Sequence, residues 1–265
     1  MKKNWQAAVD ADPRLFIGSI AKCFQMLEAL NTASRAAGLT ELARLSGLNR
    51  SSAQRITHTL RALGYLKQDP VTKTFRLSGR MLEFGYTVLS TNELRERVAP
   101  HLEELNRRTG ETVNLMELES DEIVYVARYP SRHAVSVDLH VGSRLPAFCS
   151  AAGRAILSQL EPADAMARLK NVHRAAMTDR TVTDLAALSR LLAEARQQGF
   201  ALNDQEAFIG DISIAAPLST ADGKILAAVN IAVPWPRWQL EDVLARLVPL
   251  LLRAAKAINR DIRFL

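Results

Sequence analysis

The stretch from Asn49 to Leu66, NRSSAQRITHTLRALGYL, has two distinct faces when it is drawn as a helix. With a turn of about 100° per residue, its apolar side chains fall within about a quarter of the circumference, and its polar side chains project opposite. The apolar set is Ala53, Ile56, Leu60 and Leu63, and the polar set is Ser51, Gln54, Arg55, His58 and Arg61. One face is therefore expected to pack, and the other offers hydrogen-bond donors, acceptors and cations.

The flanking sequence predicts two further helices and a hairpin. Residues 16–30 place apolar side chains at helical spacing. After a polar loop, Thr40 is the predicted N-cap of a short helix that ends at Gly47, and Asn49 is the predicted cap of the next helix. The segments YLKQ and TFRL, on either side of the turn-rich DPVTK, are predicted to be short strands. Two short helices joined by a glycine-containing turn and followed by a hairpin are typical of a winged helix-turn-helix.

Positive charge is concentrated in the same third of the chain. The 265 residues have a formal net charge of +6, yet residues 1–90 contain 13 Lys and Arg against 6 Asp and Glu, a net charge of +7. The remaining residues contain 21 basic and 22 acidic side chains. A basic module joined to a near-neutral remainder indicates a polyanionic partner, although charge alone is also compatible with an ordinary solvated face.

The composition is that of a soluble protein, with 48% hydrophobic and 23% charged residues. No apolar run approaches the roughly 18 residues of a membrane span, and the N-terminal MKKNWQAAVDADPRLF lacks the apolar run of a secretory signal. The two cysteines, Cys23 and Cys149, give no disulfide framework and no structural zinc site. We expect a cytoplasmic protein that holds neither a metal nor a cofactor and does not bind a membrane.

The sequence predicts an α+β protein with residues 14–78 as the winged domain, 79–91 as a linker helix and 92–265 as a second domain. In the second domain, ETVNLMEL, EIVYVARY, AVSVDLHV, DISIAAPLS and KILAAVNIAV are predicted strands, and SAAGRAILSQL and DLAALSRLLAEARQQG are predicted helices. A long helix is expected at the C-terminus with a kink near Pro249, and Pro100 is expected to start or kink a helix. Helices at both ends of a mostly antiparallel sheet indicate a sensor-type domain.

Two longer stretches of the second domain carry a family likeness: GSRLPAFCSAAGRAILSQL and GFALNDQEAFIGDISIAAPLSTADGKILAAVNIAV. With the winged helix-turn-helix and the linker, they resemble the IclR-type bacterial transcription regulators over nearly the whole chain. The family motifs are a Leu-Pro-aromatic segment that runs into Ser-x-x-Gly-Arg, and an acidic stretch before an Ala-Pro strand pair. The matching residues are Leu145, Pro146, Phe148, Ser150, Gly153, Arg154, Asp204, Glu206, Ala216 and Pro217.

The stretch IVYVARYPSRHAVSVDLHVGSRLPAF is similar to the subgroup that governs aromatic-acid breakdown, whose members respond to protocatechuate, 4-hydroxybenzoate or β-ketoadipate-like acids. The resemblance implies a GAF-like α/β effector-binding domain and a small carboxylic acid as effector. Asn203 stands where many relatives have Asp, and Asn230 where several have Ser, so a relative that senses a keto acid or a sugar acid stays open as an alternative.

The resemblance also implies that the Asn49–Leu66 helix enters the major groove of double-stranded operator DNA. Gln54 and Arg55 suit adenine and guanine through paired hydrogen bonds, and the polar groups at the helix start suit phosphates. The predicted DNA-binding residues are Thr40, Arg44, Asn49, Arg50, Ser51, Ser52, Gln54, Arg55, His58, Lys67, Lys73 and Arg76.

For the effector, Ser150 is expected to begin a helix whose unpaired N–H groups hold a carboxylate. The apolar side chains just before it are expected to wall a slot, and three polar residues are placed in the pocket by the resemblance. The predicted effector-binding residues are Leu145, Phe148, Cys149, Ser150, Ala151, Gly153, Asn203, Asp204, Ser213 and Asn230. Arg154 is expected to be a structural ion-pair partner.

Two other classes of function were weighed against a ligand-responsive regulator. A thiol hydrolase would use Cys149 with His133 or His140 as base, but no orienting third group stands at a recognisable spacing. An architectural DNA binder would show no ligand response. The chain is therefore expected to be a non-enzymatic regulator.

The linker helix indicates self-association. Met81, Leu82, Phe84, Val88 and Leu89 give it more apolar surface than one small domain requires, so it is expected to pack against a second copy, although packing on the first helix would also cover it. Helix-turn-helix regulators read paired half-sites as symmetric dimers. The resemblance adds pairing of dimers into tetramers.

Overall fold

The computed structural model describes residues 14–33, 35–133 and 138–265. The chain divides into two compact units, Met1–Val88 and Leu89–Leu265, and each is described by itself. Within the described ranges, the helices are all too short or too polar to cross a membrane. The predicted absence of an N-terminal signal concerns residues that lie mostly outside the described part of the chain.

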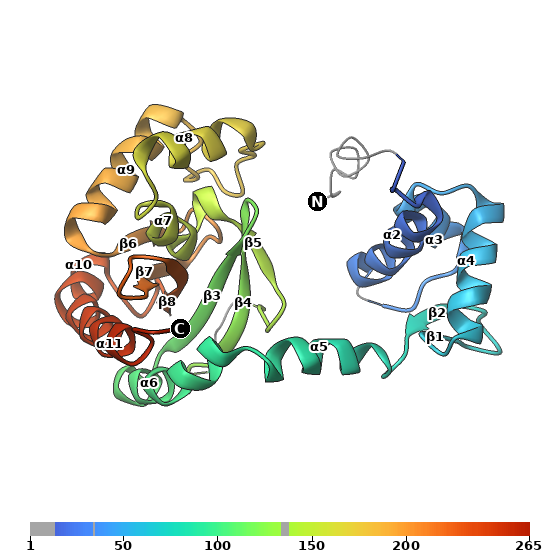
Figure 1. The fold of residues 1–265 in the computed structure, drawn as a ribbon, viewed down its shortest axis with the longest axis horizontal. Coiled ribbons are helices and arrows are strands. Elements are labelled where there is room, and N and C mark those ends of the chain that lie inside the picture. Colours follow the sequence, from blue (N-terminus) through green and yellow to red (C-terminus); the bar gives the residue numbers. More distant parts are fainter. Residues whose placement is uncertain (1–13, 34, 134–137) are drawn as a thin grey trace. The chain divides into compact units, whose positions relative to one another are not determined.

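The first unit is a winged helix-turn-helix, as predicted (Figure 1). Its elements are α2 (Gly18–Ala33), α3 (Leu39–Ser46), α4 (Arg50–Ala62), β1 (Leu66–Gln68) and β2 (Phe75–Leu77). The two strands form an antiparallel hairpin, and an isolated bridge between Ala37 and Phe75 ties the hairpin to the loop before α3. The core consists of Met26, Leu30, Ala37, Leu42, Ala43, Ala53, Leu60, Leu66 and Phe75.

The ends of α3 and α4 show why the chain turns between them. Gly47 ends α3 with a φ of 70°, a left-handed conformation that glycine adopts without strain. Asn49 caps α4, as predicted, because its Oδ1 accepts a hydrogen bond of 2.8 Å from the N–H of Ser52. The prediction for Thr40 is wrong: Gly38 occupies the N-cap of α3, and Thr40 lies in its first turn.

The packed face of α4 also differs in one respect from the helical projection. Leu63 is 54% exposed because the helix ends at Ala62, so the 100° spacing no longer applies to it. Its expected place in the core is taken by Thr57, which is 1% exposed and donates a hydrogen bond of 2.9 Å from its hydroxyl to the carbonyl of Ala53. A polar side chain is tolerated there because the helix backbone satisfies it.

Two helices follow the hairpin, α5 (Met81–Ser90) and α6 (Glu93–Thr109). Asn92 caps α6 by accepting a hydrogen bond of 2.8 Å from the N–H of Arg95. Pro100 was expected to start or kink a helix, but α6 begins seven residues earlier and continues through it. None of the side chains of α5 is buried.

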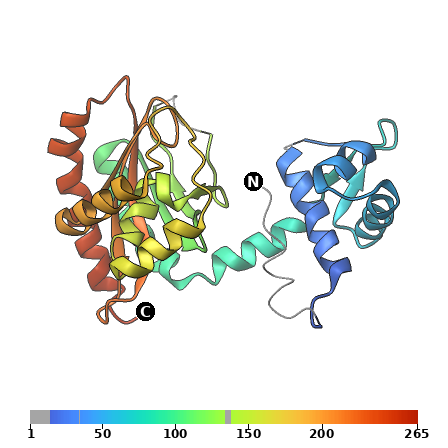
Figure 2. The ribbon, with the colours of Figure 1, turned by 90° about the horizontal axis from the view of Figure 1, so that it is seen from above.

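The strands of the second unit form one antiparallel sheet in the order β5-β4-β3-β8-β7-β6. Figures 1 and 2 show α6 and α11 on one face of this sheet and α7 on the other. The strands are β3 (Thr112–Glu119), β4 (Glu122–Tyr129), β5 (Arg144–Pro146), β6 (Ala201–Asp204), β7 (Asp211–Ser219) and β8 (Ile225–Pro234). The α+β class is thereby confirmed.

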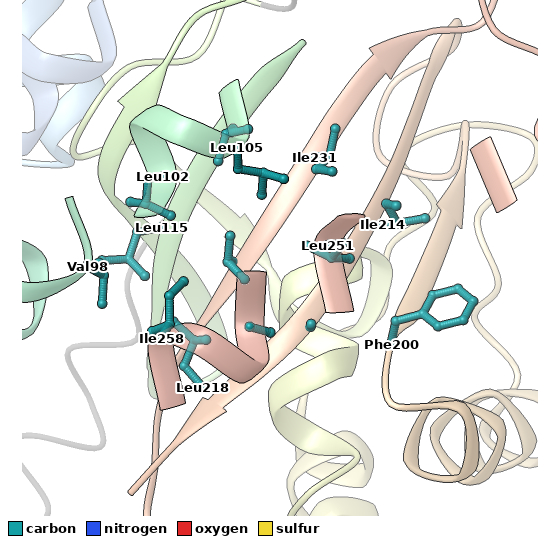
Figure 3. Packing of buried hydrophobic residues seen from close by; sticks show 14 of the residues in the cluster. Val98, Leu102, Leu105, Leu115, Phe200, Ile214, Leu218, Ile231, Leu251 and Ile258 are labelled. Atoms are coloured by element: carbon teal, nitrogen blue, oxygen red, sulfur yellow. The ribbon is translucent and has the colours of Figure 1, made fainter. Parts of the chain in front are cut away.

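The larger core lies between the sheet and the helices α6 and α11 (Val248–Asp261) (Figure 3). Val98 and Leu102 of α6 and Leu251 and Ile258 of α11 are completely buried against alternate residues of the strands. Because strand side chains alternate between faces, the residues in between point to the opposite face. That opposite face, covered by α7 (Ala151–Leu157), holds the second core cluster.

Three details complete the second unit. The C-terminal helix is interrupted where a kink was expected: α10 (Leu240–Asp242) leads into a π-helical segment, Val243–Leu247, and Pro249 follows near the start of α11. Helix α8 (Pro162–Asn171) was not predicted, whereas α9 (Leu185–Gln198) was. AVSVDLHV was expected to be a strand, but its residues 138–141 are not in a strand, and residues 134–137 lie outside the described part.

Candidate functional site

The outer face of α4 and the wing present the residues that were expected to contact DNA. Thr40 and Arg44 of α3, the exposed positions of α4 and the three wing cations all have exposed side chains; Ser52 alone among the expected residues is half-buried. A cleft of about 500 Å³ runs between α4, the start of α3 and the hairpin. Of the expected set, it brings together Thr40, Arg50, Gln54, His58 and Lys73, while Arg44, Asn49, Ser51, Ser52, Arg55, Lys67 and Arg76 lie outside it.

Side-chain hydrogen bonds fix the geometry of this cleft. Arg50 Nη1 donates to Thr40 Oγ1 (3.4 Å), and Arg61 Nη1 donates to Gln68 Oε1 (2.7 Å), so α4 is tied to α3 at one end and to the wing at the other. Arg61 therefore joins α4 to the wing, and its side chain also contributes a positive charge to the surface. These links hold the exposed side chains of α4 at a fixed angle to the hairpin.

The wing turn is built around Asp69. Its Oδ1 accepts hydrogen bonds from the N–H groups of Thr72 (2.7 Å) and Val71 (2.9 Å), and these bonds lower the pKa of the Asp69 carboxyl. Lys73 then adopts a φ of 56°, and its N–H donates to the Asp69 carbonyl (3.0 Å). Asp69 is therefore committed to the turn N–H groups and lies near Lys73, the one wing cation whose charge it also feels among the described contacts.

The second unit contains a cavity of about 250 Å³ over the face of the sheet that α7 covers. Six of the ten expected effector residues line it: Leu145, Ser150, Ala151, Asn203, Ser213 and Asn230. Ser150 is the N-cap of α7, with its hydroxyl accepting a hydrogen bond of 3.2 Å from the N–H of Gly153. The N–H groups of the first turn of a helix have no partner inside the helix, so the end of α7 that meets the cavity is electropositive.

The other four expected residues do not line the cavity. Phe148 points away from it and lines a separate small void with Leu157 and Leu169. Gly153 packs on the backbone, because a Cβ there would lie 2.2 Å from the Ala147 carbonyl oxygen. The Asp204 carboxylate accepts from Arg180 Nη1 (3.4 Å) and Gln205 Nε2 (3.1 Å).

Cys149 is the fourth of these residues, and its thiol is completely buried. Its sulfur lies 3.7 Å from the Pro146 carbonyl oxygen and 3.5 Å from Met177 Sδ. Burial raises the pKa of this thiol to about 12, which opposes formation of the thiolate that nucleophilic catalysis requires. The geometry therefore gives the thiol-hydrolase alternative no support.

A polar row crosses the cavity wall, and of its three residues only Asn230 was predicted from the sequence. Arg128, Asn114 and Asn230 are direct cross-strand partners on the adjacent strands β4, β3 and β8. Arg128 Nη1 donates to Asn114 Oδ1 (3.1 Å), and Asn114 Nδ2 donates to Asn230 Oδ1 (2.7 Å). The available signal was an arginine and an asparagine inside otherwise apolar strands, where unpaired polar groups are costly.

A β-bulge decides which side chains of β4 reach the cavity. The register shifts between Leu115, which pairs with Ala127, and Met116, which pairs with Tyr125, so Val126 is the extra residue. In a regular strand, Tyr125 and Arg128 would face opposite sides because they are three positions apart. The bulge puts both on the cavity wall.

Three acidic groups, Asp211, Tyr125 and Glu111, line the cavity. Burial raises the pKa of Asp211 to about 7, and the positive charge of Arg128 opposes that rise. The pKa of the Tyr125 hydroxyl is also raised, first by burial and then by the charge of Asp211. The Glu111 carboxylate accepts hydrogen bonds from Arg237 Nη2 and from Trp238 Nε1 (2.9 Å). Arg128 therefore faces an acid whose charge is sensitive to pH near neutrality.

Behind the cavity, Arg154 and Glu206 form a buried bidentate pair, as expected for Arg154. Nη1 and Nη2 of Arg154 lie 2.5 Å and 2.6 Å from the two Glu206 oxygens, and Nε donates to the Phe148 carbonyl (2.8 Å). Val182 N–H also donates to Glu206 (2.9 Å). The Gly-Arg and Asp-x-Glu motifs are thus one structural unit that fixes α7 against β6.

Metal binding has no candidate in the ranges that the structure describes, because no group of three or more His, Cys, Asp or Glu side chains gathers there in a suitable arrangement. A winged helix-turn-helix joined to a domain with a mixed polar and apolar cavity defines a class of protein. That class is the DNA-binding regulator with a separate ligand-binding domain.

The chain belongs to the IclR family of bacterial transcriptional regulators. Residues 86–260 match the domain described as the bacterial transcriptional regulator IclR C-terminal domain, and residues 19–70 match the IclR helix-turn-helix domain. The Pca regulon regulatory protein of Pseudomonas putida is 32% identical over 94% of this chain and 85% of its own length.

Solved structures agree with this assignment. A putative transcriptional regulator from Rhodococcus sp. RHA1 is 34% identical with a TM-score of 0.79, covering 93% of this chain and 98% of its own. An IclR homologue from Microbacterium hydrocarbonoxydans, solved in complex with 4-hydroxybenzoate, is 27% identical with a TM-score of 0.77, covering 92% of this chain and 99% of its own. The sequence-based resemblance to this family is confirmed.

Proposed function

We propose that this regulator controls catabolic genes in response to a small aromatic carboxylic acid that binds in the cavity of the second unit. It acts in the cytoplasm on operator DNA and catalyses no reaction. The observation that carries the proposal is the Arg128–Asn114–Asn230 row on the wall of a cavity with a mixed polar and apolar lining. The 4-hydroxybenzoate bound to the Microbacterium homologue and the name of the Pseudomonas relative support the same chemical class.

The cavity supplies each interaction that such an acid needs. Arg128 provides a positive charge for the carboxylate, and the first-turn N–H groups of α7 provide donors at Ala151 and Ala152. Met116, Leu145 and Phe208 provide apolar contacts for a ring. A volume of about 250 Å³ suits a molecule below the size of a typical drug, for which pockets of roughly 300–1,000 Å³ are usual.

Operator recognition belongs to the α4 face and the wing. Gln54 and His58 are exposed in the cleft, and Arg55 is exposed beside it, so these side chains suit base edges. The wing cations Lys67, Lys73 and Arg76 suit phosphates of either strand. The helix-turn-helix then places the same contacts on each half-site of a symmetric operator.

Self-association follows from uncovered apolar surface in the first unit. Leu82, Phe84, Tyr86 and Val88 of α5 are between 57% and 75% exposed, and Ile17, Ile20 and Phe24 at the start of the first unit are more than half exposed. Such apolar surface on a folded unit marks an interface. We propose that a second copy of the chain covers this apolar surface, which gives a homodimer with two DNA-binding units. Pairing of two such dimers is a further step of the proposal.

The test is a thermal-shift screen of the full chain against benzoate, 4-hydroxybenzoate, protocatechuate, short keto acids and sugar acids. A ligand at about 100 times its Kd adds roughly 2.7 kcal/mol to the free energy of unfolding and raises Tm clearly. We expect aromatic acids to produce the shift in wild type and in Arg108→Gln, an exposed arginine of α6 outside the cavity, but not in Arg128→Gln. A response only to keto or sugar acids, or an equal response in Arg128→Gln, would overturn the proposed effector.

A further inference from the structure

Arg95 connects the cavity wall to the end of the linker helix. It lies in the first turn of α6, where its own N–H is held by the Asn92 cap (2.8 Å). Its guanidinium then donates twice to main-chain carbonyls: Nε to Val126 (3.1 Å) and Nη1 to Leu89 (3.4 Å). Leu89 is in the last turn of α5, the helix through which the chain passes from the first unit to the second.

The carbonyl that Arg95 holds belongs to the bulge residue itself. Val126 is the extra residue of β4, and its presence is what turns both Tyr125 and Arg128 toward the cavity. A bulge leaves its extra residue outside the regular ladder, so its carbonyl depends on another donor. Arg95 supplies that donor. A shift of the bulge should therefore be accompanied by a shift of the Arg95 guanidinium.

A second link braces the same junction. Asn92 Nδ2 donates to Glu117 Oε1 (2.7 Å), and Glu117 lies on β3 opposite Val124 of β4. The start of α6 is thus anchored to β3 and β4, two of the three strands that carry the cavity row. The Asn92 link ends on the side chain of Glu117, whereas the Arg95 guanidinium spans from the bulge carbonyl to the Leu89 carbonyl of α5.

We propose that Arg95 is a positioning residue that transmits the occupancy of the cavity to the linker helix. The inference rests on the proposed function, since it assumes that a ligand contacts Arg128 or Tyr125. A ligand that draws either side chain inward shifts the bulge, and the planar guanidinium must either follow the Val126 carbonyl or release the Leu89 carbonyl. Both responses alter the last turn of α5, the helix through which the chain passes from the DNA-reading unit to the second unit.

The test separates coupling from binding. Arg95→Lys keeps the charge, but an ammonium cannot span both carbonyls with a fixed fork. Arg97→Lys is the matched control, because Arg97 lies on the same helix, is exposed, and pairs only with Glu93 (2.5 Å) among its recorded contacts. Operator DNA is selected in vitro from random sequence, and its Kd is measured with and without the acid that gives the largest thermal shift.

Wild type and Arg97→Lys are expected to show a change in operator Kd of roughly 5–150-fold on adding the acid. In Arg95→Lys this change is expected to fall below about 2-fold, a coupling free energy under about 0.4 kcal/mol, while the Kd of the acid stays within about 2-fold of wild type. An unchanged ratio overturns the inference. A large loss of acid affinity also overturns it, because Arg95 would then only support the cavity.

A double-mutant cycle measured without ligand tests the role of Arg95 even if no acid in the panel binds. Failure of every acid to bind would count against the proposed effector and not against the role of Arg95. Operator affinity is measured for wild type, Arg128→Gln, Arg95→Lys and the double variant. If Arg95 transmits the state of the cavity wall, the effect of Arg128→Gln on operator Kd is lost in the Arg95→Lys background. Additive effects of the two substitutions would contradict the inference. Circular dichroism and Tm confirm that each variant is folded.

Discussion

Lys67 and Arg76 lie directly opposite each other across the two strands of the wing, and both side chains are exposed. Like charges at directly opposed positions destabilise a hairpin. The acid in this hairpin that could offset them, Asp69, is committed to the N–H groups of the turn. This pair of opposed cations supports the proposal that the wing contacts a polyanion, which neutralises both.

The wing pair predicts opposite effects on stability and on DNA binding. Lys67→Ala and Arg76→Ala should each leave the free energy of unfolding unchanged or slightly raise it, because a repulsion is removed. Each should weaken binding to operator and to random DNA alike, and reduce the slope of log K against log salt by about 1. Fluorescence anisotropy across a salt series measures the slope, with Lys170→Ala on α8 as a control that should not move it. Loss of operator binding with random DNA unaffected would contradict a phosphate role.

The recognition helix gives a complementary prediction. Gln54 is exposed on α4 and lines the cleft beside the wing. Its side-chain amide suits adenine through two hydrogen bonds, so Gln54→Ala should cost about 1–3 kcal/mol on the selected operator and much less on random DNA. Competition binding with both DNAs measures the difference. Thr59→Ala, on the same helix but with its hydroxyl donating to the Arg55 carbonyl (2.9 Å), is the control. An equal loss on both DNAs would show that Gln54 contacts phosphate.

The first unit was largely predictable because its signals are local. Helical spacing, the Asn49 cap and the Gly47 turn act within a few residues, and the structure reproduces them. A threonine near a helix start is typical of a cap, but Gly38 and not Thr40 holds the N-cap of α3. The predicted burial of Leu63 is wrong because helical periodicity applies only as far as Ala62, where α4 ends.

The cavity was predictable only in part because its wall is assembled across strands. Ser150, Asn203, Ser213 and Asn230 were named from motifs, and all four line the cavity. Arg128 was not named, since its role depends on cross-strand register and on a bulge that no local pattern reveals. Motif membership does not distinguish ligand contact from packing: Phe148 and Gly153 belong to the same motif and serve the fold alone in this geometry.

The glycine of that motif can be tested for its packing role. A Cβ at position 153 would lie 2.2 Å from the Ala147 carbonyl oxygen and 2.4 Å from its Cα, and backbone cannot move aside as a flexible side chain can. Gly153→Ala should therefore lower the free energy of unfolding by several kcal/mol, on the order of an overpacked core. Gly18→Ala, where nothing lies within 4 Å of the new Cβ, should be neutral or slightly stabilising. Urea unfolding followed by tryptophan fluorescence checks both, and equal midpoints for the two variants would refute the packing argument.

Asp211 predicts an unusual dependence of stability on pH. Its pKa in the folded chain is about 7, raised by burial from an ordinary value of 3.8. Below about pH 4 both states hold the proton, and between about pH 4 and 7 only the folded state does, so unfolding releases a proton in that window. The free energy of unfolding therefore falls as pH rises from 4 to 7. The slope is at most about 1.4 kcal/mol per pH unit, the value for release of one proton on unfolding.

Asp211→Asn should remove this fall and be more stable than wild type at pH 8 but not at pH 4.5. Asp222→Asn is the control of opposite sign: hydrogen bonds from Thr220 and Lys224 lower the pKa of Asp222, so its removal should lose stability only above the window in which that carboxyl ionises. Tm measured from about pH 2 to 8 gives both profiles. The affinity for a carboxylate ligand should also fall as pH rises. A carboxylate bound beside Arg128 is repelled by Asp211 only when Asp211 is ionised, which requires a pH above neutrality. Its Kd should rise as pH passes through 7 in wild type and stay level in Asp211→Asn; parallel profiles in the two proteins would exclude Asp211 as the titrating group.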